Sequence, residues 1–165
     1  MHRQAHGNRP ALRLWAAAAL ILGVVLALAS AQRPARATLE DSITYAKHRV
    51  QFRQPIANFQ AIRFKIAEMA AEIEAARQLM YHAADLDDRR ERCDKEASMA
   101  KWFATEMGVR VTSKALQVHG GVGVTKDFRA ERYFRNARVM PIPDGTTEIQ
   151  KLIIGRNTLG VSAFS

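Results

Sequence analysis

The sequence predicts an all-α protein, an antiparallel bundle of the four-helix type, on the basis of three observations. In two long segments, apolar residues recur at alternating steps of three and four, as they do in helices that bury one face. Prolines, paired glycines and a charged run separate the segments where antiparallel helices need connections. After residue 37, no stretch alternates between apolar and polar residues as a half-buried strand does.

The first two predicted helices flank a loop that contains Pro55. Residues 38–50, TLEDSITYAKHRV, form one helix or the end of a longer one. Pro55 and Asn58 then mark the start of a second, long helix. The apolar seam of this second helix, which we expect to face the core, comprises Phe59, Ile62, Ile66, Met69, Ile73, Ala76, Met80 and Ala83. Burying one large side chain of such a seam contributes about 1.5–3 kcal/mol.

Three further helices are predicted after a charged link at residues 85–94. The third helix spans about 95–118 and stops at Gly120–Gly121, because glycine readily ends a helix. Its inward-facing side chains are expected to be Ala100, Phe103, Met107, Val111, Ala115 and Val118. A short helix near 130–138, a proline-bounded loop and a last helix at about 147–159 complete the bundle.

The composition suits one globular domain and argues against a nucleic-acid-binding protein. Of 165 residues, 48% are hydrophobic and 25% are charged. Residues 1–37 hold five arginines and no acid, whereas the other 128 residues hold 20 basic and 16 acidic groups, interspersed as on a solvated surface. We therefore expect no nucleic-acid partner, and we expect no metal site. Cys93, the only cysteine, excludes an internal disulfide and is expected on an exposed loop.

Residues 1–37 stand apart from the bundle and allow three interpretations. Residues 14–32 carry no charge, follow a basic stretch and end near Ala29-Ser30-Ala31, a small-x-small pattern. Together these features favour a secretory signal. The apolar run is also just long enough for a membrane anchor, which would be the only basis for membrane contact. In the third interpretation, the segment continues the helix of residues 38–50 into a core that lies upstream, as after a displaced translation start.

Two loops offer groups that can bind a phosphate-bearing ligand. The stretch HRVQFRQP, residues 48–55, places two arginines and a glutamine between helices, and arginine forks bind phosphate through paired hydrogen bonds. A solvated loop is the simpler interpretation of these residues alone. The stretch QVHGGVG, residues 117–123, lets a ligand approach the backbone, but it lacks the spacing of a Rossmann or Walker motif. His119 by itself is more typical of a packed or capping residue than of a catalyst.

The third polar feature is MPIPDGTTEIQ, residues 140–150, which places Asp144 just before Thr146–Thr147. These residues suit a helix N-cap, worth about 1 kcal/mol, and the cap is the simpler interpretation. A cap does not require the stiff Pro-Ile-Pro approach, however. A carboxylate fixed at the mouth of a helix suits proton abstraction when burial tunes its pKa.

Taken together and in this order, three stretches resemble the carboxy-terminal domain of the acyl-CoA dehydrogenases. They are YAKHRVQFRQPIANFQAIRFKIAEMA, ALQVHGGVGVTKDFRAERYFRNARV and IPDGTTEIQKLIIGR, and the resemblance covers about residues 35–159. It implies a helical bundle of a flavoprotein that uses FAD to oxidise an acyl-CoA thioester to its α,β-unsaturated form. It also implies a homo-oligomer, a tetramer in the family, with an electron-transfer flavoprotein as electron acceptor. The implied location is cytoplasmic, with which a signal or anchor conflicts.

The resemblance assigns roles to single residues. Asp144 holds the position of the catalytic base, where it would take the α-proton while the flavin takes the β-hydride. Gly145 and Arg156 hold positions on the substrate side. The turn at residues 48–55, called the arginine turn, would contact FAD largely from a neighbouring subunit. The implied FAD contacts are Arg49, Gln51, Phe52, Phe59, Gln60, Gln117, Val118, His119, Gly120, Gly121, Thr146, Thr147 and Glu148.

The sequence departs from the family's pattern at several points. Asp144 replaces the usual glutamate, so its oxygens retreat by roughly 1.5 Å, which suits an α-branched or alicyclic acyl group or a weakened activity. Pro143 replaces an aromatic residue and predicts a reshaped pocket, and Arg53 stands where the turn normally has glycine. We expect the family's amino-terminal and middle domains to be missing. The main alternative function is therefore a non-catalytic bundle that only self-associates, and a flavin monooxygenase of the same fold is a third possibility.

Overall fold

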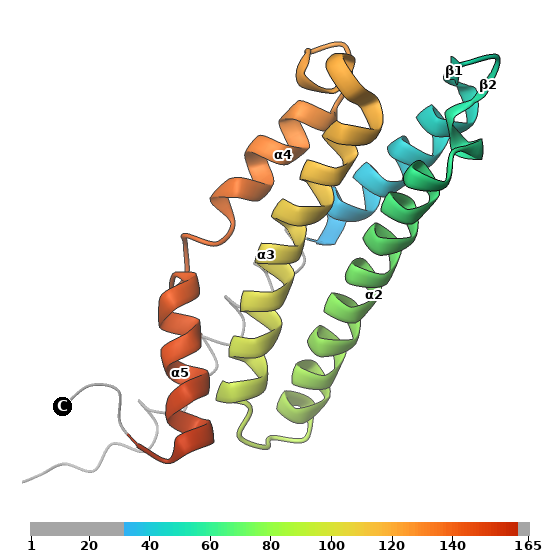
Figure 1. Ribbon diagram of the computed structural model, residues 1–165. Coiled ribbons are helices and arrows are strands. Elements are labelled where there is room, and N and C mark those ends of the chain that lie inside the picture. The colour runs from blue at the N-terminus through green and yellow to red at the C-terminus, as the bar shows by residue number, and fades with distance from the viewer. Residues whose placement is uncertain (1–31, 162–165) are drawn as a thin grey trace, which may run out of the picture.

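The computed structural model describes residues 32–161 and has the all-α architecture that the sequence predicts (Figure 1). The first helix occupies the described residues 32–48. Two long helices follow, α2 (Gln60–Asp88) and α3 (Asp94–His119), which are joined by a short connection and run antiparallel. Two shorter helices, α4 (Ala130–Val139) and α5 (Thr147–Leu159), complete the bundle.

Helix α3 is central, because it packs against α2 on one side and against α4 and α5 on the other. The two short helices follow one another along α3, so that together they fill one position of the bundle (Figure 1). Pro141 and Pro143 occupy the break between them, where proline prevents a continuous helix. The break lies beside α3, part-way along the bundle rather than at one of its ends, and Gly145 in the break contacts Lys101 of α3.

The predicted seams form the core. Met69, Ala76 and Ala83 of α2 are buried, and their neighbours in the seam are half-buried. From α3, the buried members are Ala100, Met107, Val111, Ala115 and Val118, whereas Phe103 is half-buried. Ala35 of the first helix joins the same cluster. The periodicity of the sequence therefore predicted the correct inward faces.

Two details of the connections differ from the sequence-based expectation. The loop before α2 contains a small antiparallel hairpin, in which β1 (Val50–Gln51) pairs with β2 (Gln54–Pro55). A 3₁₀ turn at Ile56–Asn58 leads from the hairpin to α2. Helix α2 also continues to Asp88, so the charged link predicted at residues 85–94 is shorter. Charges on the solvent side of a helix do not end it, which explains the difference.

The exposed position predicted for Cys93 is wrong. Cys93 is 1% exposed and directly precedes α3 as its N-cap residue. Its charged neighbours reach solvent while the thiol packs inward, so the polarity of the surrounding sequence was a misleading guide. Burial raises the pKa of the Cys93 thiol, and the nearby acidic groups Asp87, Asp94 and Glu96 raise it further.

Between residues 32 and 161, no helix combines the length and the apolar character needed to cross a bilayer. The signal, anchor or helix continuation predicted for residues 14–32 lies, but for its last residue, outside the described part of the chain.

Candidate functional site

The arginine turn is a tight hairpin turn with an unusual backbone. Its two central residues, Phe52 and Arg53, have φ angles of 51° and 67°. Two successive left-handed residues are typical of the type I′ turn, which matches the twist of a two-stranded hairpin. Arg53 adopts this conformation although a non-glycine residue loses roughly 1–2 kcal/mol in it. The turn is therefore formed without the glycine that Arg53 replaces.

The hairpin and the end of α3 line one cavity of about 580 Å³. Most of the residues singled out in the two loops meet in this cavity. They are Arg49, Gln51, Phe52 and Phe59 on the hairpin side and Val118, His119, Gly120 and Gly121 on the α3 side. The exposed residues Gln60 and Gln117 lie next to them in the chain, on α2 and α3, but do not line the cavity.

The space in front of the paired glycines is open. A Cβ atom on Gly120 or Gly121 would meet no atom within 4 Å, and Gly120 has a φ angle of 64°. A ligand can therefore approach the backbone here. Gly123 differs, because a Cβ there would lie 2.9 Å from the Leu116 carbonyl oxygen, so this glycine serves packing.

His119 forms a wall of the cavity as a packed residue. Its side chain is 4% exposed, its Nδ1 donates a hydrogen bond to the Ala115 carbonyl oxygen at 2.8 Å, and its ring stacks on Tyr45 at 4.5 Å. Opposite it, the rings of Phe52 and Phe59 meet edge to face at 6.1 Å. Guanidinium and amide donors, aromatic faces and an open backbone together fit a ligand that carries both phosphates and ring systems.

Asp144 lies elsewhere in the chain, in the break between α4 and α5. Its side chain is exposed and does not line the cavity of the arginine turn. Asp144 and Gly145 both have left-handed backbones, with φ angles of 56° and 86°. A Cβ atom on Gly145 would lie 2.7 Å from Gln150 Nε2, so a larger residue there would displace the Gln150 amide as well as strain the backbone. Within residues 32–161, the Asp144 carboxylate forms no hydrogen bond or ion pair.

Buried polar side chains hold the backbone of this break. Lys101 Nζ donates a 2.6 Å hydrogen bond to the Gly145 carbonyl oxygen. Gln150 Nε2 lies 3.1 Å from the same oxygen and 3.2 Å from that of Asp144. Burial lowers the pKa of Lys101, and the negative charges of Asp144 and Glu106 oppose this shift.

The sequence-based expectations did not include Lys101, Glu106 or Gln150. Lysine is almost never fully buried, so a lysine within a helix is normally taken for a surface residue. A signal was nevertheless present. Lys101 lies four residues after Ala97 and seven before Gly108, on a stripe of small residues that must face a close neighbour.

The first turn of α5 continues from this break. Thr146 is the N-cap residue but makes no capping hydrogen bond through its side chain, so the predicted cap is formed only by the backbone. Thr147 Oγ1 donates instead to Glu106 Oε1 at 2.7 Å. Hydrogen bonds from its own backbone N–H and from Thr146 lower the pKa of the exposed Glu148 carboxyl. Arg156 is exposed in the last turn of α5.

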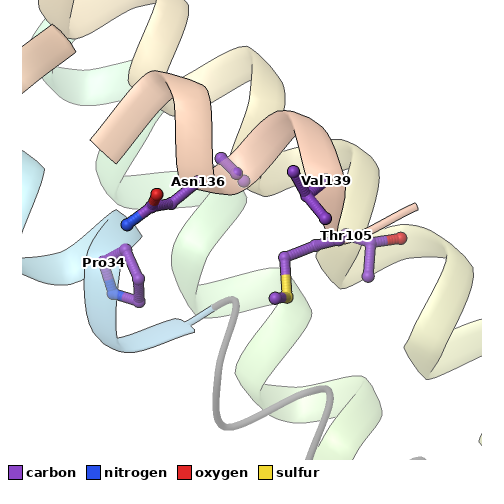
Figure 2. Close-up of a pocket in the computed structure, with 7 residues that line it drawn as sticks. Pro34, Thr105, Asn136 and Val139 are labelled. Carbon is purple, nitrogen blue, oxygen red and sulfur yellow. The ribbon is translucent and has the colours of Figure 1, made fainter. Parts of the chain in front are cut away.

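A second cavity, of about 300 Å³, lies close to the break. It is lined by side chains of the first helix, α3 and α4 (Figure 2), namely Pro34, Thr105, Gly108, Asn136, Ala137, Val139 and Met140. Most of these groups are apolar. Met140 lies four residues before Asp144, so this cavity adjoins the loop that carries the carboxylate.

Comparison with known proteins decides the family. The family model described as acyl-CoA dehydrogenase, C-terminal domain, matches residues 15–159. The chain belongs to the acyl-CoA dehydrogenase family. The match to this family begins upstream of residue 35, where the resemblance seen in the sequence starts, and it includes most of the apolar run at residues 14–32.

Several members of the family are similar to the chain over most of its length. An acyl-CoA dehydrogenase of Bacillus subtilis is 50% identical over 145 residues, which are 88% of this chain and 38% of the relative. A 3-(aryl)acrylate reductase of Clostridium sporogenes is 46% identical over 85% of this chain and 37% of its own length. A caffeyl-CoA reductase-Etf complex subunit of Acetobacterium woodii is 47% identical over 73% of this chain and 32% of its own length.

Among solved structures, butyryl-CoA dehydrogenase from Megasphaera elsdenii has a TM-score of 0.83 at 38% identity. This comparison covers 85% of this chain and 37% of that one. The chain thus spans little more than a third of the length of the relatives from B. subtilis, C. sporogenes and M. elsdenii.

Proposed function

We propose that the chain is the carboxy-terminal part of an FAD-dependent acyl-CoA dehydrogenase, which oxidises an acyl-CoA thioester to the 2,3-enoyl-CoA. The observation that carries this proposal is the cavity in which the arginine turn meets the paired glycines, within a chain that matches the family over residues 15–159. Because the chain spans little more than a third of its relatives, the activity belongs to an assembly with the remaining domains.

The lining of the cavity supports FAD as its ligand. Arg49 and Gln51 supply N–H donors for the pyrophosphate, and the open backbone at Gly120–Gly121 allows the phosphates to come close. The rings of Phe52 and Phe59 offer surfaces for a ring system. FAD, when bound, would accept a hydride from the β-carbon of the substrate.

We infer that the site is completed between copies of the chain. Asp144 and the cavity lie at different places in one copy, so one copy alone does not bring the carboxylate to a flavin held in its own cavity. A homo-oligomer removes this difficulty, because the cavity of one subunit then faces the break of its neighbour. Thr146, Thr147 and Glu148 would contact the same flavin from the side of the break, with Gly145 and Arg156 near the substrate.

Asp144 takes the α-proton in this proposal. That proton becomes acidic enough to transfer when hydrogen bonds polarise the thioester carbonyl. The carboxylate is exposed in the chain by itself, and substrate and neighbouring domains would cover it and exclude water from the reaction. The apolar cavity behind Met140 offers room for bulk near the reacting carbons, which favours an α-branched or alicyclic acyl group.

The same site supports the reverse direction as a second candidate. The relatives from C. sporogenes and A. woodii are named as reductases, and proton and hydride transfer at the α- and β-carbons are reversible. The name of the A. woodii relative also supports an electron-transfer flavoprotein as the redox partner. A cytoplasmic location is part of this proposal. The structural alternative is a bundle that self-associates without binding flavin.

The test uses the full chain, alone and co-expressed with a polypeptide that carries the family's amino-terminal and middle domains (the upstream partner). We expect FAD to show a perturbed absorption spectrum with one of these preparations and an acyl-CoA to bleach it. Asp144→Asn should abolish bleaching while FAD stays bound, since loss of a general base costs about 10²–10⁴ in rate. Asp85→Asn, at an exposed acid of α2, is the matched control and should leave bleaching intact.

Two outcomes would contradict the proposal. An unperturbed flavin spectrum in both preparations would leave only the self-associating bundle. Bleaching that survives Asp144→Asn would remove Asp144 from the reaction.

A further inference from the structure

The largest fully buried side chain of the described residues is a lysine. Lys101 is 0% exposed and lies in the first half of α3, a helix whose other buried residues are mostly small. Burying an ammonium group is costly unless it is hydrogen-bonded to a well-placed acceptor. The acceptor is the Gly145 carbonyl oxygen, 2.6 Å away and 44 residues along the chain. The buried ammonium group of Lys101 therefore fixes the position of the Gly145 carbonyl group.

The Gly145 carbonyl belongs to the peptide group one residue beyond Asp144, which carries the exposed carboxylate. Asp144 has a φ angle of 56°, a left-handed conformation that costs a non-glycine residue free energy, and Gly145 follows with a φ angle of 86°. Support comes from two sides, because Gln150 of α5 donates to the carbonyl oxygens of both residues while Lys101 of α3 donates to the second. These bonds restrain the backbone of Asp144 and therefore the direction of its Cα–Cβ bond, whereas no described residue bonds its carboxylate.

We propose that Lys101 is a positioning residue for Asp144: by fixing the Gly145 carbonyl, it holds the backbone that aims the Cα–Cβ bond of Asp144 toward the reacting α-carbon. The inference rests on the proposed role of Asp144 as the base. Lys101 does not touch the substrate, and its side chain stays beneath the break. Geometry on this scale matters, because misplacing a catalytic group by about 1 Å costs about 10²-fold in rate.

A competing explanation is that Lys101 only stabilises the packing of α5 against α3. The two roles differ in what their loss changes. Loss of a residue that only stabilises helix packing lowers the global stability and loosens the whole interface, including the hydrogen bond between Thr147 and Glu106. A positioning residue affects the mobility of residues 144–147 and the turnover number, with little effect on substrate or FAD affinity.

The experiment compares Lys101→Met with Lys114→Met in the full chain. Lys114 is a lysine of the same helix that is bonded to Glu68 and Glu72 of α2 at 2.8 and 2.7 Å, on the side away from the break. Amide hydrogen exchange at residues 144–147 should accelerate at least about tenfold in Lys101→Met and less than about twofold in Lys114→Met. If exchange at residues 144–147 is unchanged in Lys101→Met, the proposal is wrong.

The second readout is turnover in the FAD-bound assembly with the upstream partner. Lys101→Met should lower kcat by about 10- to 100-fold, keep KM within about threefold and leave FAD affinity unchanged, whereas Lys114→Met should keep the wild-type kcat. Faster exchange with an unchanged kcat would show that Lys101 only stabilises helix packing, and it would overturn the positioning role. Equal losses in FAD affinity and kcat would do the same.

Two provisions keep the test decisive. If Lys101→Met does not fold, Gln150→Met loosens the same carbonyl groups from α5, and it should give a smaller acceleration at residues 144–147. If the wild-type assembly does not bleach with any acyl-CoA, the proposed function fails and the positioning role falls with it. The exchange experiment still decides separately whether Lys101 restrains the backbone of Asp144.

Discussion

Two pairs of left-handed residues, Phe52–Arg53 and Asp144–Gly145, are held in different ways. The first pair forms an exposed hairpin tip, where the local turn and two short strands are the main support. The second pair lies in a break between helices, where buried side chains of α3 and α5 bind its carbonyl oxygens. The tip depends on local geometry, whereas the break depends on the tertiary structure.

This difference indicates which parts of the candidate site have a fixed geometry within one chain. The break is fixed by contacts that span 44 residues of sequence, so its geometry is present before any ligand or partner arrives. Phe52 at the hairpin tip is 87% exposed and lines an open cavity. This half of the site can therefore pack against a ligand or against the surface of another subunit. Substitutions at the two places should therefore act on different properties.

The largest effect is expected for Gly145→Ala. The new Cβ would lie 2.7 Å from Gln150 Nε2 in a backbone with a φ angle of 86°, so we expect the free energy of unfolding to fall by about 2 kcal/mol. Denaturant titration measures this change. Gly121→Ala is the matched control, because its Cβ meets open space, and it should stay within about 0.5 kcal/mol of the wild type. Equal stability losses would erase the contrast between the two regions.

Gly121→Ala should instead affect the ligand. A methyl group in front of the glycine backbone occupies the space through which FAD phosphates would approach, and we expect FAD affinity to fall about tenfold, or about 1.4 kcal/mol. Fluorescence titration of FAD into the assembly that binds it measures this change. Unchanged affinity would place the cofactor away from the paired glycines.

Arg53→Gly tests the strain at the hairpin tip. Glycine adopts a φ angle of 67° without steric cost, and although it also gains freedom in the unfolded chain, we expect a net stabilisation of about 1 kcal/mol. Thermal or urea unfolding provides the measurement. Arg53→Ala keeps the unfavourable conformation and should give no gain. A stabilisation by both variants would point to charge rather than backbone strain.

The smallest effect is expected for the ion-pair network between α2 and α3, outside both regions. Burial by itself raises the pKa of Glu72, but hydrogen bonds from Lys114 and Arg110 outweigh it and hold the pKa below 4.5. A carboxyl whose pKa is lowered by folding stabilises the protein above its unfolded pKa, and this contribution is lost as the pH falls through the folded pKa. Glu72 is partly exposed, so we expect only about 0.5 kcal/mol at neutral pH.

Unfolding of Glu72→Gln and the wild type from pH 7 to pH 3 tests this expectation. The difference in the free energy of unfolding should shrink below pH 4.5. Glu40→Gln, which removes an exposed pair on the first helix, should change stability by less. A difference for Glu72→Gln that stays constant with pH would show that packing, and not charge, causes it.

The sequence predicted the helices well because their signals are local. Asn58 lies two residues before α2, Gly120 directly follows α3, and the prolines at 141 and 143 lie in the connection that precedes α5. The spacing of apolar residues predicted which faces are buried. The roles of Arg49 and Asp144 stay predictions, although the structure brings most of the residues of the arginine turn and the glycine loop into one cavity.

The misjudged residues depend on contacts between distant segments. Cys93 has charged neighbours in the sequence, yet the fold covers its thiol. Lys101 has a charge that normally indicates solvent, yet a carbonyl group 44 residues away satisfies it. Neither partner can be identified from the spacing of residues, because each contact is defined only when α3 has packed against the rest of the chain. The stripe of small residues that includes Lys101 indicates a close neighbour but does not say which one.

The reactivity of the buried Cys93 thiol can report local unfolding of the bundle. Because the chain has one cysteine, 1% exposed at the start of α3, an aromatic disulfide reagent can react only when the connection between α2 and α3 opens. The rate of colour development, compared with that of a free thiol, would measure how often this end of the bundle separates. The same reading could be taken before and after FAD is added, without any label being introduced.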